Sequence, residues 1–115
     1  MTNLSRFLPL SPAALHILIV LASEDLHGYG IMQEVAKQTD DQYRLGPGTL
    51  YDNLQKLLDQ RLIEEVNRRD SEDPRRRYYR LTSLGERVVA AEIQRLESVF
   101  RKVKTHLHSI KPRRA

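Results

Sequence analysis

The stretch GPGTLYDNLQKLLDQRLIEEV, residues 46–66, decides which fold this chain can adopt. Its leucines recur at a spacing that places them on one face of a helix: Leu50, Leu54, Leu57 and Leu58. Pro47 is compatible with the first turn of that helix. After Gln60 the pattern changes to Leu62-Ile63-Glu64-Glu65-Val66, which predicts a short strand. A helix that leads directly into a strand and then into a basic loop has the element order of a winged helix-turn-helix.

The outer face of the predicted helix carries polar groups suited to a nucleic acid. At about 100° per residue, the positions opposite the leucines are Thr49, Asp52, Asn53, Lys56 and Gln60, with Tyr51 and Gln55 on one flank. Asn53 can pair with an adenine edge and Lys56 with guanine acceptors, whereas Tyr51 is expected to touch the DNA backbone. A solvent-facing helix is polar for simpler reasons too, so the surrounding elements must decide between the two interpretations.

The chain has 115 residues and is expected to contain one compact body. Its 19 Lys and Arg residues exceed its 15 Asp and Glu residues, and this net charge of +4 permits a nucleic-acid partner without proving one. The absence of cysteine excludes disulfides and thiolate metal sites, and fits a reducing compartment. The longest apolar run, residues 17–22, is too short to cross a bilayer, and no secretory pattern is present. We therefore predict a cytoplasmic protein without a membrane partner.

Two helices are predicted before the helix at residues 47–60. Ser11 and Pro12 match an N-cap and a first helical position. Residues 13–22 are apolar almost all round, as expected of a central buried helix, and His16 within them is expected to pack rather than to bind metal. Residues 31–38 predict the second helix.

Residues 23–28 are expected to form a turn, and Gly28-Tyr29-Gly30 then opens the second helix. Two glycines beside His27 could suggest a phosphate-binding loop. No third glycine, lysine-threonine pair or preceding strand supports that interpretation.

Two strands, at residues 61–67 and 77–81, should enclose a polar hairpin tip that contains a proline and no apolar residue. Between residues 61 and 80 there are seven arginines and five acidic residues. Arginines at the bases of a hairpin can follow a phosphate backbone or enter a narrow minor groove. The alternative is a solvated loop whose charges mostly cancel. We favour contact with DNA, because the wing and the polar helix would lie side by side. The candidate residues are Arg68, Arg69, Arg75, Arg76 and Arg77.

The last predicted helix begins at Ser83, which has the spacing of a capping box with Glu86. It extends for about 27 residues, or about 40 Å. Its apolar positions alternate in steps of 4 and 3, as in a heptad seam: Val89, Ile93, Leu96, Phe100, Val103, Leu107 and Ile110. A body of about 80 residues, about 26 Å across, cannot cover a helix of that length. The remaining stripe is expected to pair with a second copy, although one helix wrapped around its own body is the alternative.

The predicted fold is therefore mainly α with a small β-hairpin, an α+β winged helix-turn-helix followed by a long helix. Residues 1–82 would form the DNA-binding domain, and residues 83–115 the dimerisation helix and a basic tail. No catalytic arrangement is visible: His106 and His108 do not share a helix face, the serines lack a nucleophile-elbow context, and the carboxylates are scattered. We expect neither an enzyme nor a metal or other cofactor.

Several short motifs, taken in order, resemble the PadR family of bacterial transcription regulators. They are Gly28-Tyr29-Gly30-Ile31, Gly48-Thr49-Leu50-Tyr51, Leu54, Leu57, Leu62-Ile63, Arg76-Arg77-Tyr78-Tyr79-Arg80-Leu81-Thr82 and Gly85. Each motif is modest alone, but their order and spacing are specific from about Leu10 to Gly85. The resemblance implies a winged helix-turn-helix, a homodimer joined through the C-terminal helix, and usually repression relieved by a small molecule. The single closing helix is similar to that of the short-chain members.

The resemblance places the recognition face at Thr49, Tyr51, Asn53 and Lys56, and the wing at the five arginines named above. Two features depart from the family. Asp52 and Asn53 follow the tyrosine where many relatives have a proline or small residue. The DNA sequence that this protein binds is therefore not inferred from any relative's operator. The chain also lacks tryptophan and has Leu96 at the middle of the seam, which argues against capture of a flat aromatic ligand.

The leading hypothesis is a homodimeric repressor that is released from DNA by a small-molecule effector. Two recognition helices about one DNA turn apart, roughly 34 Å, would read a pseudo-palindromic site. The alternative is a winged-helix protein-interaction module that dimerises without reading DNA.

Overall fold

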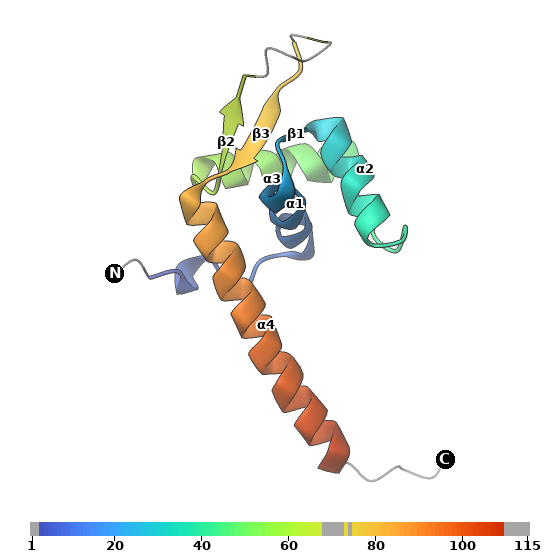
Figure 1. The fold of residues 1–115 in the computed structure, drawn as a ribbon, viewed down its shortest axis with the longest axis vertical. Coiled ribbons are helices and arrows are strands. Elements are labelled where there is room, and N and C mark those ends of the chain that lie inside the picture. Colours follow the sequence, from blue (N-terminus) through green and yellow to red (C-terminus); the bar gives the residue numbers. More distant parts are fainter. Residues whose placement is uncertain (1–2, 68–72, 74, 110–115) are drawn as a thin grey trace.

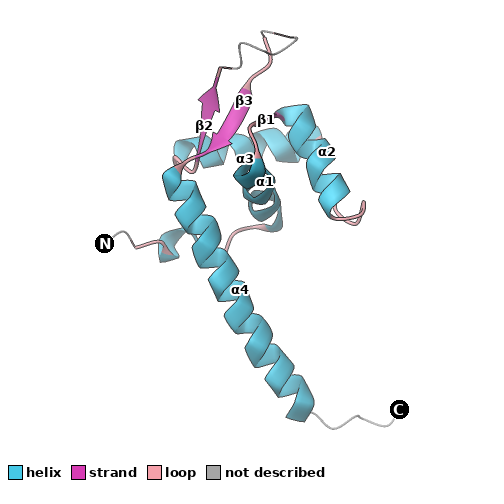
Figure 2. Cartoon of the chain, viewed as in Figure 1, coloured by secondary structure: helices cyan, strands magenta, loops and turns pink. Residues whose placement is uncertain are grey.

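Four helices and a small antiparallel sheet form the described part of the chain, residues 3–67, 73 and 75–109, in a computed structural model (Figure 1). In chain order the elements are η1 (Ser5–Phe7), α1 (Pro12–Ser23), β1 (Leu26–His27), α2 (Gly28–Gln38), α3 (Pro47–Asp59), β2 (Ile63–Val66), β3 (Tyr78–Leu81) and α4 (Ser83–Ser109). The first three helices and the sheet make one body, from which α4 projects (Figure 2). The predicted fold class is confirmed.

Helix α1 is the centre of the body, as its sequence predicts. Ile17 and Leu18 are fully buried, and the helix packs against α2, α3, α4 and β3. The Ser11 hydroxyl accepts a hydrogen bond from the Ala14 N–H at 3.1 Å, so the predicted cap is confirmed.

Helix α3 turns into β2 through a tight C-terminal motif. Its apolar face is buried at Leu50, Leu54 and Leu57. The Leu62 N–H donates to the Leu57 carbonyl and the Arg61 N–H to the Leu58 carbonyl, both at 3.0 Å. This pattern is a Schellman motif, which needs a left-handed residue just after the helix. Arg61 supplies it with a φ of 62°, and the strand follows immediately.

The sheet has three strands in the order β1-β3-β2, all antiparallel. Strands β2 and β3 form the predicted hairpin, with Ile63 opposite Leu81 and Val66 opposite Tyr78. The prediction of a turn over residues 23–28 was wrong at its end, because Leu26 and His27 pair with β3 as a short third strand. A strand of two residues has no alternation that a sequence pattern could reveal.

Helix α4 begins in the core and leaves it. The helix cap is Thr82 rather than the predicted Ser83, since the Thr82 hydroxyl accepts from the Gly85 N–H at 3.0 Å and donates to the Arg61 carbonyl at 2.7 Å. Val88, in the first turns of α4, is fully buried. After Glu92, α4 extends beyond the body, and the molecule reaches 60 Å in its longest dimension. None of the helices is long and apolar enough, within the described residues, to span a membrane.

Candidate nucleic-acid interface

The outer face of α3 is exposed and polar. Thr49, Asp52 and Lys56 face solvent, while Asn53 is half-buried. The Asn53 side-chain amide donates to the Thr49 carbonyl one turn earlier, at 2.8 Å. An amide nitrogen carries two hydrogens, so one N–H and the side-chain oxygen remain for another partner. Asn53 is thus held in one orientation by its own helix, a feature that the sequence does not reveal.

Tyr51 lies on the flank of α3 that faces the start of α2. It is 53% exposed, and its hydroxyl sits over Gly28. A Cβ at Gly28 would lie 2.6 Å from that hydroxyl oxygen, closer than any real contact. The glycine therefore makes room for the tyrosine side chain.

The arginines at the base of the wing are exposed. Arg75 lies 3.4 Å from the Asp73 carboxylate, and Arg77 lies 3.6 Å from the Glu65 carboxylate. Such exposed ion pairs contribute little to stability, so a phosphate can replace the carboxylate at small cost. Arg68 and Arg69, which belong to the same prediction, lie outside the described residues.

Arg76 makes a different contact, with a histidine that the sequence analysis did not assign to the site. Its guanidinium lies 3.2 Å from Nε2 of His27. Nδ1 of the same imidazole accepts a hydrogen bond from the Gly30 N–H at 3.0 Å and so caps α2. Burial, and secondarily the charge of Arg76, lower the pKa of His27, which favours the neutral ring that an accepting Nδ1 requires.

A two-pronged ion pair fastens the wing to the body. The Arg80 guanidinium on β3 donates to both carboxylate oxygens of Asp25, at 2.8 and 3.2 Å. These residues are 55 positions apart, so no local pattern marks them as partners. Their contact fixes β3 next to the segment that leads into β1.

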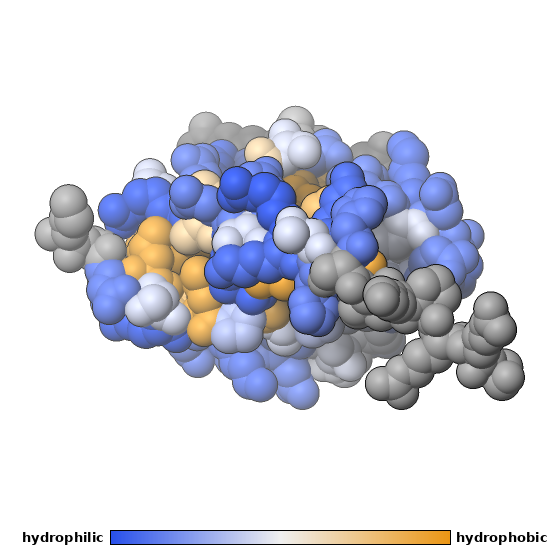
Figure 3. Space-filling view, turned by 90° about the horizontal axis from the view of Figure 1, so that it is seen from below, coloured by the Kyte–Doolittle hydropathy of each residue, from blue (hydrophilic) through white to orange (hydrophobic). Residues whose placement is uncertain are grey.

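The predicted dimer seam divides between the core and the exposed part of α4. Val89 is only 8% exposed and packs in the core of its own chain. Five members are 38–65% exposed: Ile93, Leu96, Phe100, Val103 and Leu107. Val99, which the heptad pattern omits, is exposed beside them, and Ile110 lies outside the described residues. A view from below shows apolar side chains gathered in an area bordered by hydrophilic surface (Figure 3).

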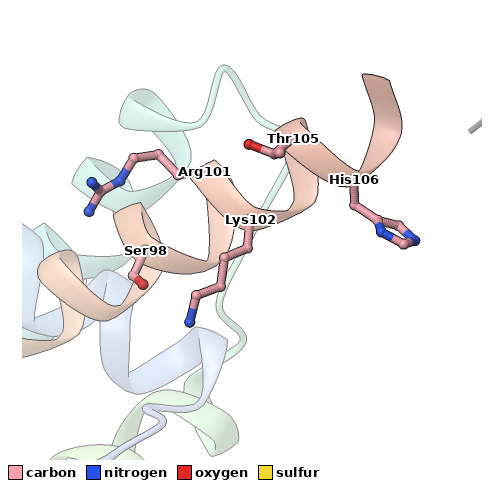
Figure 4. A pocket seen from close by; sticks show the side chains of 5 residues that line it. All are labelled: Ser98, Arg101, Lys102, Thr105 and His106. Carbon is pink, nitrogen blue, oxygen red and sulfur yellow. The ribbon is translucent and has the colours of Figure 1, made fainter. Parts of the chain in front are cut away.

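A second face of α4 carries polar and basic side chains. Ser98, Arg101, Lys102, Thr105 and His106 line a shallow hollow of about 510 Å³, and all five project from α4 itself (Figure 4). The hollow is thus a feature of one helix surface.

Among the described residues, no group of three or more histidine and acidic side chains could hold a metal ion.

Comparisons with known proteins agree with this arrangement. The model of the transcriptional regulator PadR-like family matches residues 17–91. The transcriptional regulator Rv3488 of Mycobacterium tuberculosis is 36% identical over 90 residues, which cover 77% of this chain and 79% of that protein. A solved PadR family transcription regulator of Clostridium difficile has a TM-score of 0.69 and 26% identity, with 84% of this chain and 99% of that chain covered. A transcriptional regulator of Clostridium thermocellum has a TM-score of 0.71 and 26% identity, with 81% and 87% covered. The resemblance inferred from the motifs is confirmed.

Proposed function

Because this chain belongs to the PadR-like family of transcriptional regulators, we propose that it is a homodimeric repressor. It binds a pseudo-palindromic DNA site, and a small-molecule effector releases it.

The observation that carries the proposal is the surface formed by α3 and the wing. Asn53 and Lys56 present an amide and an ammonium group on the side of α3 away from the core. The bonds between Arg61, Leu62 and α3 place β2 directly after this helix, so the wing is held next to it. A helix that fits the major groove and a wing that reaches the adjacent backbone are the parts that sequence-specific reading requires.

Dimerisation is supported by the apolar face of distal α4. A soluble monomer rarely exposes a contiguous run of large apolar side chains. Here Leu96, Phe100, Val103 and Leu107 repeat along one face with the spacing of a helix–helix seam, and their exposure rises to 65%. A second copy would cover this face and place two α3 helices in one molecule.

The effector would act through the same helix. Since α4 runs without interruption from the core into the proposed seam, a change in how two α4 helices cross would move the two bodies relative to one another. A ligand that favours one crossing over the other can shift the population between DNA-binding and released states. The hollow that begins at Ser98 offers polar and basic groups beside the seam for such a ligand.

The test is to select binding sites from a pool of random duplexes and then to measure the Asn53→Ala variant on the selected site. We expect a pseudo-palindromic consensus. The substitution should cost about 1–3 kcal/mol on that site and change binding to random duplex little. Gln55→Ala is a matched control, because Gln55 lies on the flank of α3 and its amide donates to Asp59.

Equal losses on selected and random DNA would mean that α3 only positions the protein. Failure to bind any duplex, with self-association retained, would favour the alternative of a protein-interaction module.

A further inference from the structure

A pocket of about 340 Å³ lies where three elements meet. The junction of β1 and α2 supplies His27, Gly28 and Tyr29, and α3 supplies Tyr51. The remaining wall is the arginine run before β3 together with Tyr79 of that strand. None of the residues that line it is acidic. The residues of α2 in this wall were not predicted to be part of the binding surface.

Two exposed tyrosines converge on this pocket from different helices. Tyr29 is 59% exposed and Tyr51 is 53% exposed. Within the described part of the chain, every other large apolar side chain with comparable exposure belongs to α4. Each ring brings a hydroxyl group that can donate a hydrogen bond.

The charge of the pocket comes chiefly from Arg76. Its flanking arginines face carboxylates, whereas the described contact of its own guanidinium is with His27. The hydrogen bond from Gly30 uses Nδ1 of His27 as its acceptor, so Nε2 of the neutral ring carries the proton and cannot accept from Arg76. The guanidinium hydrogens of Arg76 are therefore available to a bound acceptor. A guanidinium next to two phenol groups, with no acid in the lining, suits an anion with several acceptor oxygens.

From this geometry we propose that the pocket holds a backbone phosphate of bound DNA, with Tyr29 and Arg76 as its hydrogen-bond donors. The site rests on the proposed function and adds to it a contact from α2. A phosphodiester is favoured over a free anion because the pocket opens between α3 and the wing. Both elements would already lie along the duplex. The two glycines beside His27 are not the phosphate-binding element. Gly28 leaves room for the Tyr51 side chain, and the proposed hydrogen-bond donors are side chains.

The experiment measures binding to a random-sequence duplex over a range of salt concentrations. Tyr29→Phe keeps the ring and removes only the hydroxyl, so it should weaken binding about tenfold, the range for a hydrogen bond to a charged group. The slope of log affinity against log salt should stay the same, since a neutral donor displaces no counterion. Arg76→Gln should lower the magnitude of that slope by about 0.9, as expected for one phosphate contact.

Tyr43→Phe is the matched control, because Tyr43 stacks on His16 at 4.7 Å and does not line the pocket. It should bind the duplex like the wild-type protein. A second arm adds inorganic phosphate at constant ionic strength and follows the melting temperature. Stabilisation of the wild-type protein that disappears in Tyr29→Phe, together with unchanged duplex binding by that variant, would mean a site for free anions and would overturn the proposal.

The results also separate this inference from the proposed function. If the wild-type protein binds the duplex and Tyr29→Phe binds it equally well, the phosphate contact is wrong and the DNA-binding function stands. If the wild-type protein does not bind duplex DNA at low salt, both are wrong.

Discussion

Apolar side chains are buried in the body of the protein but exposed on the distal half of α4. In the body, residues such as Ile17, Leu50 and Leu54 are almost fully buried against elements of the same chain. On α4 beyond Glu92, residues of the same kind with the same helical spacing are exposed, as at Phe100 and Leu107. Periodicity therefore identifies the apolar face of a helix, and only the surrounding structure shows whether the chain itself covers that face.

The strongest test of this contrast is Gly85→Ala, in the part of α4 that belongs to the body. A Cβ at Gly85 would lie 2.1 Å from the Leu62 carbonyl oxygen, which is backbone and cannot rotate away. The added methyl group would push α4 away from the segment that leads into β2, and this should lower the free energy of unfolding by about 3 kcal/mol. Urea denaturation measures that free energy.

The control is Gly48→Ala in α3, where the added methyl would meet no atom within 4 Å. Alanine is the better helix former, so that change should be neutral or stabilising by up to about 1 kcal/mol. Comparable losses in the two variants would show that Gly85 is not a site of close packing.

Glu92 marks the boundary between the two regions. Its replacement by glutamine should have the next largest effect on the free energy of unfolding. The carboxylate is 1% exposed, accepts from the Arg95 side chain, and accepts from the Leu10 N–H at 2.7 Å. The hydrogen bond from Arg95, and after it the bond from Leu10, lowers the pKa of Glu92 below its ordinary value of 4.5, although burial alone would raise it. Glu92→Gln should lower the free energy of unfolding by about 1.5–3 kcal/mol at pH 7, the contribution of a hydrogen bond to a charged group.

The pH dependence has a definite sign. A carboxyl group with a lowered pKa in the folded state stabilises that state fully above pH 4.5, and the contribution is lost as the pH falls further. The difference in unfolding free energy between wild type and Glu92→Gln should therefore shrink between about pH 5 and pH 3. A difference that stayed constant over this range would mean that the charge of Glu92 is immaterial to the attachment of the N-terminal segment.

Phe100→Ala tests the other side of the comparison. Phe100 is 65% exposed, so its loss should hardly affect the body itself. If a second copy covers it, self-association should weaken about tenfold or more, since aromatic residues at the centre of an interface carry much of its affinity. Analytical ultracentrifugation over a range of concentrations measures this. Arg101→Ala, the next position along the helix, should dissociate like the wild type. An unchanged dimer in the Phe100 variant would remove this face from the interface.

The same contrast explains how much could be predicted from sequence. The leucines of α3 and the cap at Ser11 depend on spacing within a few residues, and those predictions are confirmed. The short strand at Leu26 and the bond between Leu10 and Glu92 depend on partners more than 50 positions away. His27 caps α2 although histidine is not a typical capping residue. The part of Tyr29 in the pocket follows from its neighbours on α3 and in the wing, which lie far away in the sequence. Local order can be predicted from local pattern, whereas contacts between distant segments require the fold.

The smallest effect should come from Arg61→Gly, at the turn between α3 and β2. Arg61 adopts a φ of 62°, where a side chain costs energy and glycine does not. Its exposed side chain lies outside the core, and the hydrogen bonds of the turn use backbone atoms that glycine retains. The variant should therefore unfold with a free energy about 0.5–1 kcal/mol higher than the wild type, measured by thermal and urea denaturation.

Gln60→Gly is the matched control at the preceding position, where φ is −80° and the conformation suits any residue. There glycine only increases the freedom of the unfolded chain, so the variant should lose about 0.5–1 kcal/mol. Stability changes of opposite sign at these two adjacent exposed positions would show that the gain at Arg61 comes from backbone conformation. Because this turn belongs to the body, the gain from Arg61→Gly should persist when Phe100→Ala is added and the two effects should be additive. A gain that depended on an intact distal α4 would contradict the division of the molecule into two independent regions.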